Sequence, residues 1–197
     1  HSFYALSQAA AAYYYADTVR SAILRCKRGG RPWYAQELAD RMAVLIFGAL
    51  PARRVGELPQ YRGLHTLPLY SCIVPVPPNK PRPGVPGLPL LLARRLSAVL
   101  GIPVVTPLYI KNPGRPQKEL TREQRLQNAR GAFGCRPGTD LTGRRVLLID
   151  DIITTGATAS ACALALLEAG AVEVTAVAIA AAEELPKSRK KPPEAKP

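Results

Sequence analysis

Two adjacent carboxylates, Asp150 and Asp151, follow the apolar run Val146–Ile149, and a threonine-rich turn comes directly after them. The unbroken apolar run predicts a strand that is buried on both faces of a parallel sheet. The turn precedes an Ala- and Leu-rich stretch that predicts a helix, so its backbone N–H groups and the helix dipole favour a phosphate group. The candidate phosphate-binding residues are Thr154, Thr155, Gly156, Ala157 and Thr158.

The two carboxylates suit a different chemical group from the turn. Asp150 and Asp151 would repel a phosphate, but they can accept hydrogen bonds from hydroxyl groups or face a metal-bound group. A ribose ring that carries a phosphate offers both hydroxyls and phosphate. Gly156 permits a close approach of the backbone or a positive φ. The motif therefore predicts a site for a phosphorylated ribose.

The motif has two alternative interpretations, a Walker B segment and a strand–turn–helix unit with a purely structural role. An apolar strand that ends in Asp-Asp also fits a Walker B segment, but that would need a G-x-x-x-x-G-K-[ST] loop upstream, and the sequence has none. A strand–turn–helix unit with a purely structural role would not explain two adjacent acids at the strand end. The phosphorylated-ribose site is the interpretation that accounts for both halves of the motif.

The stretch Val146–Thr158 resembles the 5-phosphoribosyl-1-pyrophosphate (PRPP) signature of type I phosphoribosyltransferases, without a gap. The resemblance implies that Asp150 binds the ribose 3′-hydroxyl and that Asp151 binds the 2′-hydroxyl. It also implies that Thr154–Thr158 hold the 5′-phosphate. The expected cofactor is Mg²⁺, which would be bound through PRPP and not directly by protein side chains.

Further blocks are similar to the ComF family, a competence-associated group of type I phosphoribosyltransferase-like proteins. They are Tyr15–Arg20 with Leu24–Lys27, Ile73–Pro77, and Pro116–Phe133. That family usually has an upstream four-cysteine zinc finger, which this sequence does not include: either it was cut off, or this member lacks it. The four cysteines lie far apart and form no C-x-x-C pair, so no zinc site is expected within this chain. The resemblance implies a link to natural competence and DNA uptake, with single-stranded DNA and competence or DNA-processing proteins as partners.

The sequence departs from the family on the pyrophosphate and acceptor sides of the site. Asn79 stands near the family's usual histidine, and Gly84–Pro89 replaces its R-G-F-N-Q segment. A polar loop, Lys111–Leu120, is expected to be mobile and to close over the site. Whether transferase activity is retained is left open, and no catalytic residue is assigned. The candidates are Pro77, Pro78, Asn79, Lys80 and Arg82 for the pyrophosphate side, and Arg115, Gln117 and Lys118 for the loop.

The periodicity and turn signals predict the elements that must position these residues. Right-handed crossovers are expected to place the strands that begin at Ser71, Val104, Arg145 and Val172 parallel to one another. His1–Ala12 has no assignment. The predicted helices are Asp17–Lys27, Tyr34–Leu50, Leu90–Leu100, Thr121–Arg130 and Ala157–Ala169. The predicted strands are Ser71–Val76, Val104–Ile110, Ala132–Cys135, Arg145–Ile149 and Val172–Ala180.

This order predicts an α/β fold of the type I phosphoribosyltransferase class, with a mainly parallel twisted sheet flanked by helices. Residues 1–68 are expected to form a helical, hood-like extension and residues 69–182 the phosphoribosyltransferase core. Residues 183–197 are rich in Lys, Pro and Glu, and they predict a disordered basic tail.

The net charge of +13 indicates an anionic ligand or partner. From Leu58 to Lys118 there is no acidic residue. Two alternatives to the ComF-type function stay open: a nucleic-acid-binding accessory protein whose PRPP site is regulatory or vestigial, and a nucleobase salvage phosphoribosyltransferase. The charge also fits a solvated basic surface without a partner.

The sequence has neither a membrane-span pattern nor a signal-peptide pattern. No run reaches the roughly 18 uninterrupted apolar residues of a membrane span, and no signal-peptide pattern is present. Scattered cysteines without a metal-ligand spacing fit a reducing compartment. A cytoplasmic protein without a membrane span is therefore expected.

Overall fold

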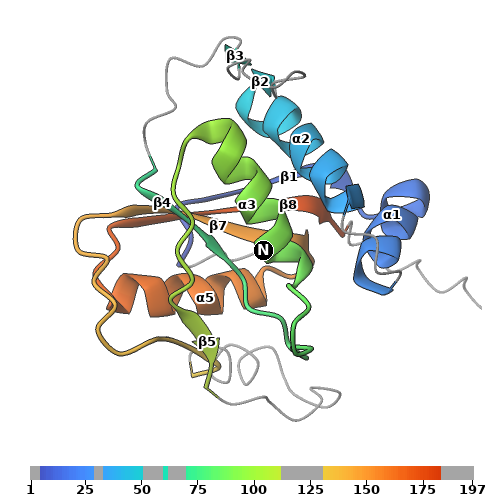
Figure 1. Ribbon diagram of the computed structural model, residues 1–197. Coiled ribbons are helices and arrows are strands. Elements are labelled where there is room, and N and C mark those ends of the chain that lie inside the picture. The colour runs from blue at the N-terminus through green and yellow to red at the C-terminus, as the bar shows by residue number, and fades with distance from the viewer. Residues whose placement is uncertain (1–4, 29–32, 51–59, 62–69, 112–130, 183–197) are drawn as a thin grey trace, which may run out of the picture.

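The computed structural model describes residues 5–28, 33–50, 60–61, 70–111 and 131–182 (Figure 1). Its centre is a four-stranded sheet with the strand order β1-β8-β7-β4, in which every neighbouring pair is parallel. The two longest strands, β7 and β8, lie in the middle of this sheet. The four strands are β1 (Gln8–Tyr14), β4 (Cys72–Pro75), β7 (Arg145–Ile153) and β8 (Glu173–Ala181).

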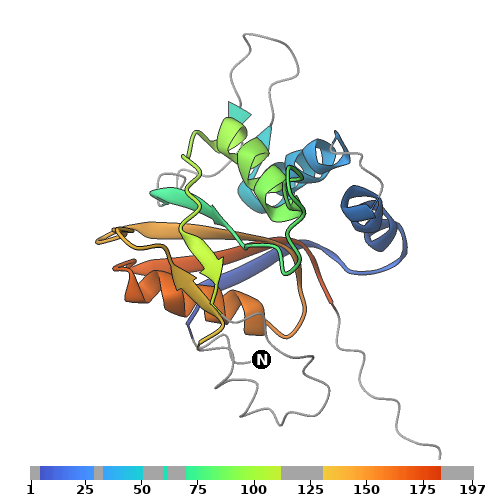
Figure 2. The ribbon, with the colours of Figure 1, turned by 60° about the horizontal axis from the view of Figure 1, so that its bottom comes forward.

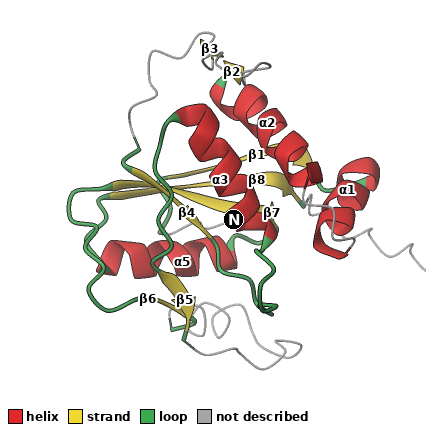
Figure 3. Ribbon diagram, in the orientation of Figure 1, coloured by secondary structure: helices red, strands yellow, loops and turns green. Residues whose placement is uncertain are grey.

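Helices cover both faces of the sheet, as the two views of the ribbon show (Figures 1 and 2). Helices α2 (Trp33–Phe47) and α3 (Leu88–Leu100) pack on one face, and α5 (Ala157–Glu168) packs on the other. Helix α1 (Asp17–Arg28) lies beside α2 at the end of the sheet (Figure 3). The predicted α/β class, with a mainly parallel sheet flanked by helices, is confirmed.

Side-chain alternation along β7 builds the two halves of the core. Leu147 and Ile149 belong to the apolar cluster under α2 and α3, whereas Val146 and Leu148 belong to the cluster under α5. All four side chains are fully buried. The continuous apolar run therefore arises because successive side chains point to opposite covered faces, as predicted for a central parallel strand.

The predicted parallel strand over Val104–Ile110 is right in its parallel direction at Val104, but it is wrong in extent. Val104 makes only an isolated parallel bridge to Ile73, and the strand proper, β5 (Leu108–Ile110), pairs antiparallel with β6 (Phe133–Cys135) in a separate two-stranded sheet. Pro103 and Pro107 flank the bridge, and because proline has no backbone N–H, a ladder cannot continue through them. The strand at β6 is close to its predicted position.

Strand β1 was not predicted from the sequence. It pairs in parallel with β8 at the edge of the sheet, from Gln8 opposite Thr175 to Tyr14 opposite Ala181. The run of alanines in β1 has a higher intrinsic preference for helix than for strand, so the pairing is imposed by β8. Within the described part of the expected N-terminal extension, α1 and α2 are helical, and residues 8–14 form a strand of the central sheet.

The remaining boundaries differ from prediction by a few residues. Helix α2 ends at Phe47, before Gly48 with a φ of 62°, and a short antiparallel pair follows, β2 (Ala49–Leu50) with β3 (Gln60–Tyr61). Strand β7 continues past Ile149 to Ile153. The predicted helix over 121–130, the boundary between residues 68 and 69, and the tail 183–197 lie outside the described residues.

One ion pair ties the two helices on the same face together. The guanidinium of Arg95 in α3 donates two hydrogen bonds to the carboxylate of Asp40 in α2, at 2.6 and 3.0 Å. Both side chains are largely buried, which strengthens such a bidentate pair relative to an exposed one. Within the part of the chain that the structure describes, no helix is long and apolar enough to span a bilayer.

Candidate functional site

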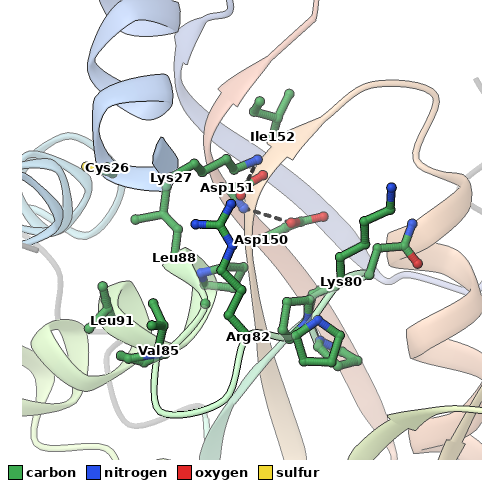
Figure 4. Close-up of a pocket in the computed structure, with 18 of the residues that line it drawn as sticks. Cys26, Lys27, Lys80, Arg82, Val85, Leu88, Leu91, Asp150, Asp151 and Ile152 are labelled. Carbon is green, nitrogen blue, oxygen red and sulfur yellow. Dashed lines mark hydrogen bonds and ion pairs between the residues drawn. The ribbon is translucent and has the colours of Figure 1, made fainter. Parts of the chain in front are cut away.

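A pocket of about 590 Å³ opens at the carboxyl end of β7, where Asp150 and Asp151 lie (Figure 4). In open α/β sheets, ligands bind in the crevice outside the carboxyl ends of the strands. The walls come from α1, from the loop between β4 and α3, from β6 and from the start of α5. Asp150 and Asp151, the acid pair singled out from the sequence, both line this pocket.

The two carboxylates are held differently although they are adjacent. Asp150 and Asp151 are only 8% and 9% exposed, and the backbone N–H of Asp151 donates a 2.8 Å hydrogen bond to Oδ1 of Asp150. Burial, and then the negative charge of Asp151, raise the pKa of Asp150 to about 7. The hydrogen bond from the Asp151 N–H and the positive charge of Lys27 act in the opposite direction.

Lys27 reaches this acid pair from the last turn of α1. Its Nζ lies 2.7 Å from Oδ2 of Asp151, and both residues line the pocket. Figure 4 shows the side chains of Lys27 and Arg82 approaching the acid pair from different elements. The sequence analysis includes Lys27 only in the family-like block Leu24–Lys27 and gives it no role in the site, because nothing in that block indicates contact with a strand more than a hundred residues later.

The predicted phosphate loop forms the start of α5. Gly156 is the N-cap residue of the helix and has a φ of 76°. Its carbonyl accepts the first helical hydrogen bond, which the Ser160 N–H donates at 2.8 Å. Thr155 Oγ1 accepts a hydrogen bond of 3.4 Å from the Ala157 N–H. Thr154 and Thr155 are exposed, and Thr158 lines the pocket. The geometry is that of a helix N-terminus beside the acid pair, as predicted.

All five residues predicted for the pyrophosphate side line the same pocket: Pro77, Pro78, Asn79, Lys80 and Arg82. They belong to the proline-rich loop between β4 and α3, which turns back at Arg82 and Val85 through a 3.1 Å hydrogen bond from the Val85 N–H to the Arg82 carbonyl. Gly84, with a φ of 73°, occupies that turn. The loop therefore brings two cations, Lys80 and Arg82, into the lining of the pocket.

An apolar wall completes the pocket, and the sequence did not predict it. Val85, Leu88 and Leu91 come from the end of the loop and the start of α3, and Phe133 comes from β6. The i, i+3 spacing of Leu88 and Leu91 at the start of a helix was the available signal, but the same spacing also marks an ordinary core face. Here Leu88 is buried while Val85 is largely exposed.

Some predicted features fall outside this picture. The loop candidates Arg115, Gln117 and Lys118 lie outside the described residues. Among the residues with a described position, no group of three or more His, Cys, Asp or Glu side chains could hold a metal ion.

Comparison with known proteins gives a consistent picture for the C-terminal part. Residues 84–196 match the model of the phosphoribosyl transferase domain. An adenine phosphoribosyltransferase of Nocardia farcinica is 37% identical over 98 residues, which are 49% of this chain and 50% of that protein. The chain thus spans about half the length of the curated relative that it matches.

Solved structures with a similar fold are more distant. A glutamine PRPP amidotransferase from B. subtilis, complexed with ADP and GMP, is 21% identical, with a TM-score of 0.42 over 73% of this chain and 26% of that one. A purine phosphoribosyltransferase from Pyrococcus horikoshii is 22% identical, with a TM-score of 0.37 over 60% of this chain and 66% of that one. Similarities at this level say nothing about the ligand.

Proposed function

Because this chain belongs to the phosphoribosyl transferase domain family, we propose that it binds PRPP in the pocket at the end of β7. The observation that supports this most directly is the buried acid pair, Asp150 and Asp151, beside the N-terminus of α5 in a pocket that also contains basic side chains. Hydroxyl acceptors, a phosphate cradle and cations are what a phosphorylated ribose with a pyrophosphate group requires.

Each part of the ligand has its own partners in this proposal. Asp150 and Asp151 accept hydrogen bonds from the ribose hydroxyls, and backbone N–H groups and hydroxyls of Thr154–Thr158 bind the 5′-phosphate. Lys80 and Arg82 face the pyrophosphate, for which they supply positive charge. The exposed Thr154 and Thr155 have hydroxyls available to a ligand that approaches from solvent.

Mg²⁺ fits this site as a partner of the ligand. The carboxylates of Asp150 and Asp151 line the pocket and suit a hard cation that retains waters and takes phosphate oxygens. When bound, Mg²⁺ neutralises charge that develops on a departing pyrophosphate. The protein's own residues orient the ribose, and the apolar wall of Val85, Leu88 and Leu91 limits access of water to one side of it.

The finer assignment that we propose is a ComF-type protein with a role in natural competence and DNA uptake. It is supported by the sequence blocks around Tyr15–Lys27, Ile73–Pro77 and Pro116–Phe133. The four cysteines are free, which fits a reducing cytoplasm. A net charge of +13 is suited to single-stranded DNA or to a DNA-processing complex. Binding to an oligonucleotide that falls steeply as salt is raised supports this role, and weak binding at low salt counts against it.

A nucleobase salvage phosphoribosyltransferase is the second candidate. Two observations favour it: the 37% identity to an adenine phosphoribosyltransferase over half of the chain, and the apolar wall, which offers a surface for a flat ring. In that reaction the base nitrogen attacks C1 of the ribose, and the C1–oxygen bond to pyrophosphate breaks. Release of pyrophosphate from PRPP on addition of a purine or pyrimidine supports this candidate, and no release with any nucleobase removes it.

Calorimetric titration tests the binding proposal itself. PRPP with Mg²⁺ is expected to bind more tightly than ribose 5-phosphate or pyrophosphate, because only PRPP occupies all three parts of the pocket. ATP serves as the comparison for a general polyphosphate site. If ATP binds as tightly as PRPP, the pocket is a site for polyphosphates and the proposal fails.

A further inference from the structure

Helix α1 places a cation directly on the acid pair, from a part of the chain that the matched family domain does not include. That domain begins at residue 84, whereas Lys27 lies in the last turn of α1. Its Nζ is 2.7 Å from Oδ2 of Asp151. No second ion pair to Asp150 or Asp151 occurs among the residues described. The ribose side of the pocket is thus completed by a segment outside the matched domain.

The packing of α1 explains why Lys27 points at the site. Ile23, one helical turn earlier, is completely buried against the cluster under α2 and α3. Residues four apart lie on the same face of a helix, so the contact that buries Ile23 also turns Lys27 towards the acid pair, where its side chain stays 40% exposed. Val19, Ala22 and Cys26 are partly buried against the same cluster. The position of the Lys27 ammonium therefore depends on how α1 is docked.

The positive charge of Lys27 reduces the electrostatic repulsion within the acid pair. Asp150 and Asp151 are adjacent, mostly buried and of like charge, and the proposed ligand is itself strongly anionic. Lys80 and Arg82 line the same pocket from the loop between β4 and α3, while Lys27 contacts Asp151 itself. A carboxylate has about four lone-pair sites, so Asp151 can accept from Lys27 and from a ribose hydroxyl at the same time.

We propose that Lys27 is a positioning residue, which holds the Asp151 carboxylate in the orientation that accepts a ribose hydroxyl and offsets the charge of the acid pair. The inference rests on the proposed function, because it assigns Lys27 a part in binding PRPP. Lys27 acts through Asp151 and not through a phosphate group. The N-terminal helix is accordingly part of the ribose-binding unit.

The ligand series tests this inference, since it separates ribose from pyrophosphate. Lys27→Met is expected to weaken binding of PRPP and of ribose 5-phosphate by the same factor, about tenfold, and to leave binding of pyrophosphate unchanged. Lys27→Arg is expected to restore most of the affinity, because it keeps the charge. Arg25→Met is the matched control: Arg25 is exposed on the same helix and does not line the pocket, so its loss should change none of the three affinities.

A double-mutant cycle distinguishes positioning from a general effect on folding. In the Asp151→Asn background, Lys27→Met should have little further effect on PRPP affinity, because the partner through which Lys27 acts is gone. Equal losses in both backgrounds, or a loss confined to pyrophosphate, would overturn the inference. An unaltered chain that fails to bind PRPP overturns the proposed function as well, whereas normal PRPP binding with no effect of Lys27→Met overturns only the role of Lys27.

Discussion

The backbone N–H of Asp151 donates a 2.8 Å hydrogen bond to Oδ1 of Asp150, so the first carboxylate is held by the peptide group of the second. This bond and the positive charge of Lys27 favour the ionised form of Asp150, but burial and the neighbouring negative charge outweigh them. The net result is a pKa of about 7 for Asp150, against 3.8 for an ordinary aspartate. The ionised form of Asp150 is therefore destabilised in the site, and a ligand hydroxyl that donates a hydrogen bond to this carboxylate would stabilise it.

The first prediction concerns stability and pH. Because the folded state retains the Asp150 proton up to about pH 7, the free energy of unfolding should rise as pH is lowered from 7 towards 4. Asp150→Asn should remove this contribution and stabilise the protein above pH 7, by up to about 4 kcal/mol for a pKa difference of this size. Urea unfolding of both proteins between pH 4 and 8 would measure it.

Asp140 serves as the control, because its pKa is shifted in the opposite direction from that of Asp150. Hydrogen bonds from Thr142 lower the pKa of the exposed Asp140 carboxyl, with its Oδ1 accepting from the Thr142 N–H at 2.9 Å. Its contribution to stability is present above its unfolded pKa and lost as pH falls through the folded one. Asp140→Asn should therefore lower stability at neutral pH. A stability difference between Asp150→Asn and the unaltered chain that does not depend on pH would contradict the assignment.

A second prediction concerns the glycine at the start of α5. Gly156→Ala should cost about 1–2 kcal/mol, because φ is 76° there, and should also weaken PRPP binding at least about tenfold by crowding the phosphate loop. Gly143 has a similar φ of 70° with open space around it. Gly143→Ala should therefore lower the free energy of unfolding through backbone strain but leave PRPP affinity unchanged. Equal PRPP affinity of the two variants in calorimetry would argue against a phosphate at the loop.

A third prediction concerns the contact between α2 and α3. Breaking the bidentate pair with Arg95→Ala or Asp40→Ala should destabilise the protein by about 1–3 kcal/mol, since either change leaves a largely buried charge without its partner. The exposed i, i+4 pair of Arg41 with Glu37 serves as the comparison, and Arg41→Ala should cost about 0.5 kcal/mol or less. Chemical denaturation measures both. Similar costs for both pairs would mean that burial does not strengthen the Arg95 contact.

Local patterns predicted much of this architecture, because its central strands are buried on both faces. The apolar run at Val146–Ile149 could only be a covered strand, and the acids after it had to lie at the sheet's carboxyl edge. Strand β1 escaped prediction because alanine has no preference for a strand, and its pairing partner lies at the other end of the chain. The antiparallel pairing of β5 with β6 was also missed, because Pro103 and Pro107 interrupt the predicted strand and its actual partner lies more than twenty residues later in the chain.

The candidate site shows the same division between local and distant signals. The acid pair and the turn after it are contiguous in sequence, so residue types and spacing were enough to predict that they lie between the end of a strand and the start of a helix. Lys27 and the wall of Val85, Leu88 and Leu91 reach the pocket only through tertiary packing, which a local motif does not encode. The proline-rich loop was identified from its composition and its position after a strand.

A fourth prediction separates the two ends of the ligand. Lys80→Ala with Arg82→Ala should weaken binding of PRPP and pyrophosphate, because both side chains line the pocket and we propose that they face the pyrophosphate. The double variant should leave ribose 5-phosphate affinity nearly unchanged. Removal of Mg²⁺ with EDTA should also weaken PRPP binding more than ribose 5-phosphate binding. Arg94→Ala is a control on the exposed side of α3. Loss of ribose 5-phosphate binding in the double variant would place the loop on the wrong side of the ligand.

The most direct measurement is calorimetric titration of PRPP with Mg²⁺ into the unaltered chain and into the variant with both Asp150→Asn and Asp151→Asn. Asparagine keeps the size of each side chain and removes the charge that the ribose hydroxyls would contact. We expect saturable binding by the unaltered chain and a loss of at least about a hundredfold in the variant, since two hydrogen bonds to charged acceptors are weakened. No binding by the unaltered chain, or equal binding by both proteins, would contradict a PRPP site at the end of β7.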